Sequence, residues 1–440
     1  MNDDLSRREL LRLAGASMGI AAFSSHSQLL SDEVRRRPKI AVVMTEFRHR
    51  SHAHVFLENF LEPYYFNGKL TKSPVDVVGF YVDQTPGGDM SREVARQYRI
   101  SIFKTIDEAC CLGGKELAVD AVFLIGEHGN YPVNELGQRE YPRKRFFDAA
   151  VAVMKRSGRF VPVFNDKHLS YRWDWAREMY CTACQNGIPF MAGSSVPLAQ
   201  RRPGLELPAG SEIEEAVSIH GGPPESYDFH GLEVLQSMVE SRRCGETGVS
   251  KVEMLSGDAL WKAAEAGRWS PDLAKAAMAA ELGKAPKSFN QIGSEEPAQP
   301  HGLLVTYKDG LKATVLKVGR SSTRWNFACR LKGDSKIHAT SFYVGPWNNR
   351  NLFKALSHAI QDHFVNRRSP YPVERTLLTT GVLEAAMRSR HSGTPIATPH
   401  LEFAYAPRDF SAMREMGLSW KIITEDIPEP QGINPNGIKK

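Results

Sequence analysis

The residues most able to do chemistry follow the end of one apolar segment. Residues 160–164 read Phe-Val-Pro-Val-Phe and are followed by Asn165, Asp166, Lys167 and His168. The segment is typical of a buried strand, and ligands of open α/β sheets collect at the carboxyl ends of the strands. We therefore expect a ligand site around Lys167, where a cationic side chain stands among other polar groups.

Short apolar runs alternate with helical patterns through the first half of the chain. The predicted strands are residues 39–44, 75–82, 100–103, 119–125 and 160–165. The predicted helices are residues 53–61, 92–98, 105–111 and 145–157. This regular alternation predicts a parallel sheet with right-handed crossovers. A long polar loop, residues 126–143, interrupts it before the last of these helices.

The pattern changes after the helix predicted over residues 171–186 and the strand over 188–192. Longer alternating strands are then predicted at residues 212–220, 248–255, 303–307, 311–318, 325–331 and 336–342. Helices are predicted at residues 229–241, 351–366 and 373–389. This part favours a largely antiparallel sheet with helices on one face. We expect residues 283–300 to be a linker and the end of the chain to be mobile.

The composition is that of an ordinary soluble globular protein. The 440 residues suffice for two cores and are 42% hydrophobic and 24% charged. Part of the net charge of +6 sits in residues 35–37 and 439–440, so nucleic acid is not an expected partner. Six cysteines do not suggest a disulfide scaffold. Cys181 and Cys184 have the spacing of a zinc or redox motif, and buried small hydrophobes are the alternative.

The N-terminus has the features of an export signal. Arg7 and Arg8 precede a mildly apolar run, residues 13–23, that is too short for a stable membrane span. Such a start is typical of a twin-arginine signal, and a frayed basic helix is the alternative. We therefore predict a periplasmic or extracytoplasmic location, with no integral membrane span in the mature chain.

Three features of the chain resemble the glucose-fructose oxidoreductase, inositol dehydrogenase and MocA family of sugar-type dehydrogenases, over about residues 39–399. Asp166-Lys167-His168 is similar to the family's Glu-Lys-Pro element, although two of the three residues differ. His230, with Glu233 three positions on, resembles its His-x-x-Asp helix. Residues 363–365, 370–374 and 380–393 resemble its closing pair of helices.

The resemblance implies hydride transfer between NAD(P) and a sugar or polyol. In the family the lysine aligns the substrate and the histidine accepts the proton, which makes Lys167 and His230 the expected catalytic pair. A base within reach of the hydroxyl and an ammonium near the developing oxyanion suit that chemistry. His168 replaces the family's proline and is either a second acid or base or a packing residue. Asp166 and Glu233 are expected to contact the substrate.

The turn after the first strand departs from the family pattern. A dinucleotide site needs glycines there, so that backbone N–H groups can approach the pyrophosphate, yet residues 45–52 contain none. Thr45, Arg48 and Ser51 would have to hold the phosphates, and Asp83 at the end of the second strand would bind a ribose diol. NAD or NADP is thus the implied cofactor, on an unusual turn.

Two further sets of residues are open to two interpretations. The polar loop offers three groups that either contact the substrate or belong to a surface loop: Glu127, His128 and Tyr131. His49, His52 and His54 have a spacing that could supply metal ligands, and a solvated turn is the alternative. Because no Asp, Glu or Cys cluster accompanies them, the predicted site includes no metal.

Two hypotheses follow for the function. The first is an exported NAD(P)-dependent oxidoreductase that acts on a sugar or polyol. The second keeps the two-domain cleft without the coenzyme, as a lyase-type proton-transfer enzyme or a carbohydrate-binding protein. The outer side of the antiparallel sheet would expose apolar positions, which favours a homo-oligomer.

The predicted fold class is α/β, with a Rossmann-like parallel sheet followed by an α+β domain that has a largely antiparallel open sheet. We expect a signal and linker at residues 1–37 and a dinucleotide-binding-type domain at residues 38–168. A substrate and oligomerisation domain is expected at residues 169–400, and a tail at residues 401–440.

Overall fold

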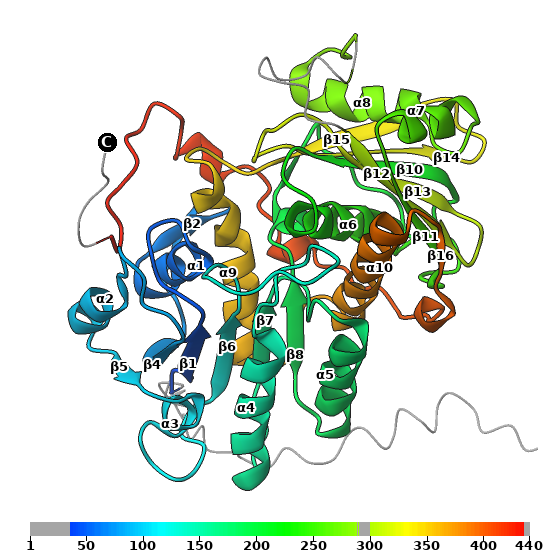
Figure 1. The fold of residues 1–440 in the computed structure, drawn as a ribbon. Helices are drawn as coiled ribbons and strands as arrows, with labels where there is room; N and C mark the ends of the chain where they lie inside the picture. The colour runs from blue at the N-terminus through cyan, green and yellow to red at the C-terminus, as the bar shows by residue number, and fades with distance from the viewer. Residues whose placement is uncertain (1–35, 288, 290–299, 435–440) are drawn as a thin grey trace, which may run out of the picture. The chain divides into compact units, whose positions relative to one another are not determined.

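Six parallel strands form the first sheet of the computed structural model, which describes residues 36–287, 289 and 300–434 (Figure 1). Their order is β5-β4-β1-β6-β7-β8, which confirms the predicted Rossmann-like sheet. The strands are β1 Lys39–Met44, β4 Asp76–Val82, β5 Ser101–Phe103, β6 Ala121–Ile125, β7 Val163–Asp166 and β8 Phe190–Gly193. The edge strand β8 comes from the chain after residue 168, where we expected the second domain to have begun.

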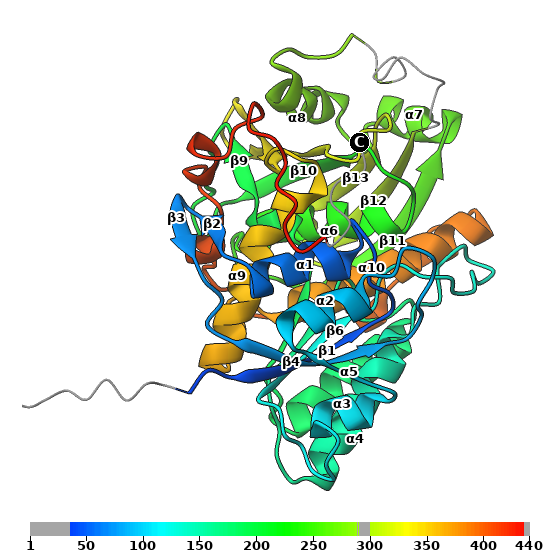
Figure 2. The same ribbon diagram turned by 90° about the vertical axis from the view of Figure 1, so that its left-hand side faces the viewer.

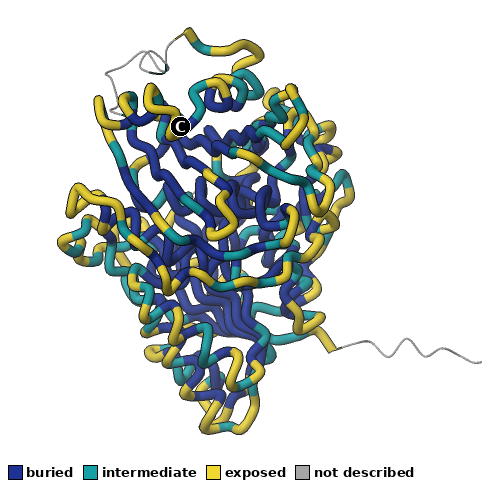
Figure 3. Tube along the Cα trace, turned by 90° about the vertical axis from the view of Figure 1, so that its right-hand side faces the viewer, coloured by how far each residue is buried: buried dark blue, intermediate teal, exposed yellow. Residues whose placement is uncertain are grey.

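Helices cover both faces of this sheet (Figure 2). They are α1 His52–Leu61, α2 Ser91–Tyr98, α3 Ile106–Cys111, α4 Arg143–Arg156, α5 Trp173–Gln185 and α9 Asn349–Asn366. On β1, Ile40 and Val42 pack with α1 and α9, whereas Ala41 and Val43 pack with α3 and α4. A strand that is buried on both faces needs apolar side chains, which explains why residues 40–44 of β1 are all apolar and fully buried. Buried segments make up the interior of the molecule (Figure 3).

The second sheet has eight strands in the order β16-β11-β12-β13-β10-β14-β15-β9. Its pairs are antiparallel except β10 with β13, which are parallel, so the predicted largely antiparallel sheet is confirmed. The strands are β9 Gln200–Arg202, β10 Ile213–His220, β11 Val249–Ser256, β12 His301–Tyr307, β13 Lys312–Lys317, β14 Trp325–Leu331, β15 Ile337–Tyr343 and β16 Ile396–Ala397. Two helices, α6 Ser226–Val239 and α10 Val373–Ser392, lie between the two sheets (Figure 1).

The outer face of the second sheet is covered by two helices that we did not predict, α7 Asp258–Glu265 and α8 Pro271–Leu282 (Figure 1). Their buried side chains form one apolar cluster with the sheet, including Leu260, Leu273, Ile219, Leu304 and Leu316. The apolar positions that suggested a homo-oligomer are therefore covered within the chain itself. The argument for self-association through that face was wrong.

A hairpin that we did not predict follows α1. Its strands are β2 Tyr64–Phe66 and β3 Lys69–Thr71, and Asn67 and Gly68 form the turn with φ of 48° and 77°. Asn-Gly favours two-residue hairpin turns because both positions require positive φ. The signal was present in the sequence, although each strand is only three residues long.

Residues 401–434 pack against the rest of the chain, so the expected mobile tail is wrong for this stretch. Glu415 is buried and accepts hydrogen bonds from the Asn67 backbone N–H at 3.0 Å and the Ser419 hydroxyl at 2.6 Å. Further along, Glu429 forms an ion pair with Arg350 of α9 at 2.8 Å. Specific buried pairs of this kind compensate for the weak apolar pattern of the tail.

Parts of two predicted segments lie outside the described residues: residues 1–35 of the signal and linker, and residues 288 and 290–299 of the internal linker. Among the helices of the described part, none is both long and apolar enough to cross a membrane. All six cysteines belong to the described part and are free thiols, with Cys184 exposed on α5 and Cys181 partly exposed.

Candidate active site

A cavity of about 420 Å³ lies where the carboxyl ends of β6 and β7 meet the start of α6. Its walls come from several segments that are distant in the sequence. The titratable residues that line it are His52, Glu127, His128, Arg139, Tyr141, Lys167, Glu225, Tyr227 and His230. The carboxyl edge of a parallel sheet is the expected place for a ligand, and the lining is rich in groups that can donate, accept or transfer protons.

A buried ion-pair network forms one wall of the cavity. Lys167 Nζ lies 2.9 Å from Glu127 Oε1, and Arg143 Nη2 donates to Glu127 Oε2 at 2.5 Å. Burial opposes ionisation of Glu127, but Lys167 and Arg143 outweigh it and hold its pKa well below the usual range. Lys167 also donates to the Ser226 carbonyl at 3.4 Å, which connects β7 to the first turn of α6.

His230 lines the same cavity from α6. Its Nδ1 lies 2.6 Å from the Ser194 hydroxyl, which also accepts the Val196 backbone N–H at 3.1 Å. Burial, and then the positive charge of Lys167, lower the pKa of His230 well below its ordinary value. The ring is therefore neutral at pH 7 and is a weaker proton acceptor than an ordinary histidine. The structure thus brings Lys167 and His230 to one cavity.

Glu225 is a cavity residue that our sequence analysis missed. It has φ 63° and ψ −73°, and the Ser226 N–H donates to the Pro224 carbonyl at 2.8 Å, which defines a γ-turn with positive φ. Burial, and then the neighbouring charge of Glu127, raise the pKa of Glu225 to about 7. The only sequence signal was Pro223-Pro224 before an acidic residue at the start of a helix.

Unusual backbone conformations gather at this cavity. Lys167, His128 and Glu225, all of which line it, have φ of 63°, 72° and 63°. For residues other than glycine such conformations cost about 1–3 kcal/mol each, and they persist where the surrounding structure over-determines them. Their concentration here supports a functional role for the cavity, because strain in proteins clusters at active and binding sites.

The other predicted catalytic residue, His168, lies behind the cavity wall. Its Nε2 is 3.1 Å from Arg143 Nη1 and 3.4 Å from Glu225 Oε1. Burial, and then the charge of Arg143, lower the pKa of His168 well below its usual range. The side chain fills the space between the two groups, which is closer to the packing alternative than to a second acid or base.

The predicted substrate-contacting residues separate into two sets. Glu127 and His128 line the cavity, and burial lowers the pKa of His128 to about 3. The remaining three bind other parts of the protein. Tyr131 donates to Asp83, Asp166 lies 2.6 Å from His52 Nδ1, and Glu233 accepts from Thr379 of α10. Asp166 therefore contacts the cavity only indirectly, because it holds His52, which lines the cavity. In the sequence, His52 was considered as a metal ligand or as part of a solvated turn.

The residues expected to hold a dinucleotide are bonded to other residues of the protein. Thr45 donates to the Glu127 carbonyl at 2.6 Å, Arg48 pairs with Glu46 at 2.5 Å, and Ser51 caps α1 by accepting from the His54 N–H. Asp83 accepts from Tyr131 at 2.6 Å, Tyr81 at 2.6 Å and Arg145 at 2.7 Å. Although burial acts against it, these hydrogen bonds, with Arg145 first, lower the pKa of Asp83.

The backbone after β1 is also paired on both sides. The Thr45 N–H donates to the Ile125 carbonyl, the Arg48 N–H to the Ser51 hydroxyl at 3.2 Å, and the Arg50 N–H to His54 Nδ1 at 3.0 Å. The Phe47 side chain is fully buried against Phe80. These contacts occupy the turn in which a dinucleotide fold leaves N–H groups for the pyrophosphate, so the residues present do not fit that group.

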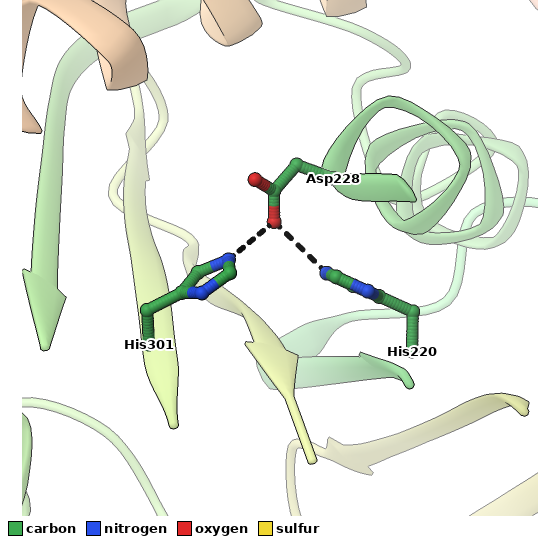
Figure 4. Close-up of side chains that lie close together, drawn as sticks. All are labelled: His220, Asp228 and His301. Atoms are coloured by element: carbon green, nitrogen blue, oxygen red, sulfur yellow. Dashed lines mark hydrogen bonds and ion pairs between the residues drawn. The ribbon is translucent and has the colours of Figure 1, made fainter. Parts of the chain in front are cut away.

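His49, His52 and His54 bind different partners. His49 and His54 rings lie 5.0 Å apart, whereas His52 pairs with Asp166. The group of three metal-ligand residue types that the described part brings together is instead His220, Asp228 and His301, from β10, α6 and β12 (Figure 4). Both imidazoles contact the same carboxylate oxygen, and all three residues are buried.

The comparisons with known proteins concern the fold. No family model and no curated protein matches the sequence. A scyllo-inositol dehydrogenase from Lactobacillus casei, solved with bound NAD(H) and scyllo-inositol, is 11% identical with a TM-score of 0.51; the match covers 82% of this chain and 99% of that one. GenD2 from gentamicin A biosynthesis, solved with NAD, is 13% identical with a TM-score of 0.51, over 82% of this chain and 96% of that one.

The fold of this chain is therefore similar to that of inositol dehydrogenases, as the sequence resemblance implied. An apo structure of scyllo-inositol dehydrogenase from Lactobacillus casei gives the same picture, with 10% identity and a TM-score of 0.50 over 82% of this chain and 98% of that one. Identities this low describe the fold, and the reaction has to be argued from the site.

Proposed function

We propose that this protein binds a sugar or polyol in the cavity and transfers a proton to or from it without a resident nicotinamide coenzyme. This is the lyase-type alternative of the two hypotheses. The observation that carries it is a contrast at one sheet edge. Lys167, Glu127 and His230 line one cavity, whereas the residues that a dinucleotide would need are bonded to other residues of the protein.

The shape and lining of the cavity support a polyhydroxylated ligand. Its volume of about 420 Å³ is in the range of small-molecule sites. Tyr227 and Trp325, which line it, stack on each other with ring centroids 5.1 Å apart and offer an aromatic wall for a sugar ring. Carboxylate, ammonium and imidazole groups on the other walls can donate to and accept from several hydroxyls.

The chain's own residues suit proton transfer next to a carbonyl. Removal of a proton from the adjacent carbon places negative charge on the carbonyl oxygen, and the Lys167 ammonium is positioned to stabilise that oxyanion. Glu127 and Arg143 hold Lys167 in place through the buried network. The neutral His230 can donate a hydrogen bond to a substrate hydroxyl without adding charge.

A second candidate function is an NAD(P)-dependent oxidoreductase acting on a sugar or polyol. The fold favours it, because similar structures hold NAD or NAD(H). The glycine-free turn and the pairing of Thr45, Ser51 and Asp83 within the protein weigh against it. The preference between NAD and NADP belongs to this candidate and is tested with it.

Mass spectrometry of small molecules released from the denatured protein separates the two candidates. The full chain is produced in the cytoplasm, purified and denatured, and is also titrated with NAD and NADP. We expect neither nucleotide in the supernatant and no saturable binding. Proton transfer is followed by NMR as exchange of substrate hydrogen for deuterium in D₂O, with Lys167→Ala as the inactive control. Stoichiometric NAD or NADP would reject the coenzyme-free proposal in favour of the second candidate.

We also propose that residues 1–37 direct export to the periplasm or the outer surface. The support is the sequence alone, with Arg7 and Arg8 before a short apolar run. A coenzyme-free enzyme would suit a compartment that holds little free nucleotide. Fusion of residues 1–37 to a reporter should export it, and Arg7→Lys with Arg8→Lys should retain it inside. Retention of the unaltered fusion would reject the signal.

A further inference from the structure

We propose that Glu225 exchanges the proton with the substrate, and that Asp228, itself held by His220 and His301, positions Glu225 for that step. The inference rests on the proposed proton-transfer function and deepens it. It names the substrate class as a polyhydroxylated compound with a carbonyl group next to a C–H bond. Glu225 is the catalytic residue in this proposal, and Asp228 and the two histidines are positioning residues.

The Glu225 carboxyl is placed to exchange a proton. It lines the cavity, and its Oε1 atom accepts no hydrogen bond from the residues that the structure describes. Its charged and titratable neighbours are Glu127 and Arg143 on one side, Lys167 after β7, and Asp228 on its own helix. His168, also after β7, lies 3.4 Å from Glu225 Oε1 through its Nε2. With a pKa of about 7, the group is present in both protonation states at neutral pH, which suits an acid and base.

Asp228 holds the unusual turn in which Glu225 lies. Its Oδ2 accepts the Glu225 backbone N–H at 2.9 Å. Its Oδ1 accepts from His220 Nε2 at 2.9 Å and from His301 Nε2 at 2.7 Å (Figure 4). Both carboxylate oxygens are thus engaged, one toward the catalytic turn and one toward β10 and β12 of the second sheet. The two histidines fix Asp228, and Asp228 fixes the direction of the Glu225 main chain.

The protonation states agree with this arrangement. Burial opposes ionisation of Asp228, but His301 and His220 outweigh it and lower its pKa, so the carboxylate keeps accepting hydrogen bonds. Burial lowers the pKa of His220, which therefore donates as a neutral ring. Asp228 therefore stays charged over the pH range in which Glu225 titrates.

The same three side chains are of types that bind metal ions, but the structure favours hydrogen bonds. A histidine that binds a metal through one nitrogen normally donates its other N–H to an acceptor. His220 Nδ1 is buried and, within the described residues, has no partner. As an N–H it would be an unsatisfied donor, whereas a neutral ring that donates through Nε2 leaves only a lone pair there. Bound metal is therefore an outcome that the experiment must be able to detect.

The proposed step is balanced without an oxidant. Ionised Glu225 takes the proton from the carbon next to the carbonyl, so that the C–H bond breaks, a carboxyl O–H bond forms, and the electron pair becomes an enolate that Lys167 stabilises. The enolate then expels the hydroxyl group on the next carbon, and Glu225 returns its proton to that group, which leaves as water. Return of the proton to the first carbon instead produces exchange.

The first test needs no substrate. The side-chain carboxyl carbons of glutamate are labelled with ¹³C in the full chain, and their NMR titration is compared between the wild type and Glu225→Gln. We expect one carboxyl that titrates near pH 7 and is absent from the variant. In Asp228→Asn the same signal should titrate at lower pH, because the negative neighbour is lost and the turn is released to solvent. A Glu225 signal with an ordinary titration would overturn the inference, whatever the reaction proves to be.

The second test measures deuterium exchange in D₂O with D-fructose, D-glucuronate and scyllo-inosose as probes. Glu225→Gln should lower the rate by at least ~10²-fold and Glu225→Asp should restore part of it. Asp228→Asn should lower the rate about tenfold and move the acidic limb of the pH profile, which follows ionisation of Glu225, to lower pH. Asp258→Asn, at the exposed start of α7, is the matched control and should change neither.

The two tests separate the possible failures. A Glu225 that titrates near pH 7 in a protein that carries stoichiometric NAD(P) rejects the proposed function and leaves the positioning of Glu225 by Asp228 supported. An unshifted pH profile in a folded Asp228→Asn protein rejects the positioning role. Elemental analysis of the purified protein that finds one zinc or iron per chain, lost in Asp228→Asn, rejects it as well, because the three side chains would then be a metal site.

Discussion

The polar residues at the carboxyl edge of the parallel sheet differ between its two halves. After β1 and β4, Thr45, Ser51 and Asp83 bond to the protein's own backbone and side chains. After β6 and β7, Glu127 and Lys167 form a buried ion pair at the wall of a cavity. In dinucleotide-binding folds the first half is where the dinucleotide lies, and in this chain its polar residues are paired within the protein.

The difference shows that one edge of a parallel sheet can hold a cavity at some strands and paired polar residues at others. The first half is occupied by contacts between loops that are distant in the sequence, such as Tyr131 with Asp83 and the Thr45 N–H with the Ile125 carbonyl. The second half retains buried charge, positive φ at three residues and a carboxyl with a raised pKa. Features of this kind are costly, and proteins keep them mainly where they serve a function.

The largest expected effect is on the free energy of unfolding, and it is tested with two arginines of α4, one at each half of the edge. Arg143 is fully buried on Glu127, and Arg145 is half exposed on Asp83. Arg143→Met should lower the free energy of unfolding by about 3–5 kcal/mol, because it removes one partner of a buried pair. Arg145→Met should cost at most about 1 kcal/mol. Urea denaturation measures both, and equal losses would contradict the distinction between the halves.

Loss of the ammonium should affect turnover more than stability. Lys167→Ala removes the group that stabilises the oxyanion but leaves Glu127 paired with Arg143. We expect deuterium exchange to fall by about 10²–10³-fold, which corresponds to roughly 3–4 kcal/mol of transition-state stabilisation. Because Lys167 has positive φ, Lys167→Gly is the control for backbone strain. If deuterium exchange is unchanged in either variant, Lys167 and the cavity after β6 and β7 do not take part in the reaction.

Glu225 should make stability depend on pH. Its pKa is raised from 4.5 to about 7 in the folded protein, so the folded state binds the proton more tightly than the unfolded state. The stabilisation is complete below pH 4.5 and is lost as the pH rises to about 7, with a total of roughly 3 kcal/mol. The measurement is the difference in unfolding free energy between the wild type and Glu225→Gln at each pH. A flat difference would show that Glu225 has an ordinary pKa.

The smallest effect is expected in the first half. Asp83→Asn loses the charge that Arg145 and the two tyrosines contact, so unfolding should become easier by about 1 kcal/mol. Exchange of the carbonyl probes should not change, since Asp83 lies outside the cavity. Isothermal titration calorimetry measures the binding of NAD and NADP. Weaker binding in this variant than in the wild type would show that the first half is a coenzyme site and would contradict the distinction between the halves.

The prediction from sequence was accurate where burial follows a local period. Each strand of the first sheet was found within two or three residues of its end, because runs such as Lys39–Met44 are buried on both faces. Helix α8, which is rich in alanine, and the packed tail were not predicted, because their burial does not follow a local period in the sequence. Leu273 of α8 and Glu415 of the tail are held by contacts with distant strands and turns, which a local pattern does not report.

The amino-acid sequence by itself determined the parallel sheet and the place of Lys167 at its carboxyl edge, because both follow from the order of apolar and polar residues along a single strand. Tertiary structure alone decided that Glu225 lines the same cavity. It also placed His220 and His301, 81 positions apart in the chain, within hydrogen-bond distance of the Asp228 carboxylate. Tertiary structure likewise decided that the turn after β1 is paired within the protein. These outcomes depend on which buried groups meet across the fold, and the pKa and backbone conformation of each group follow from those neighbours.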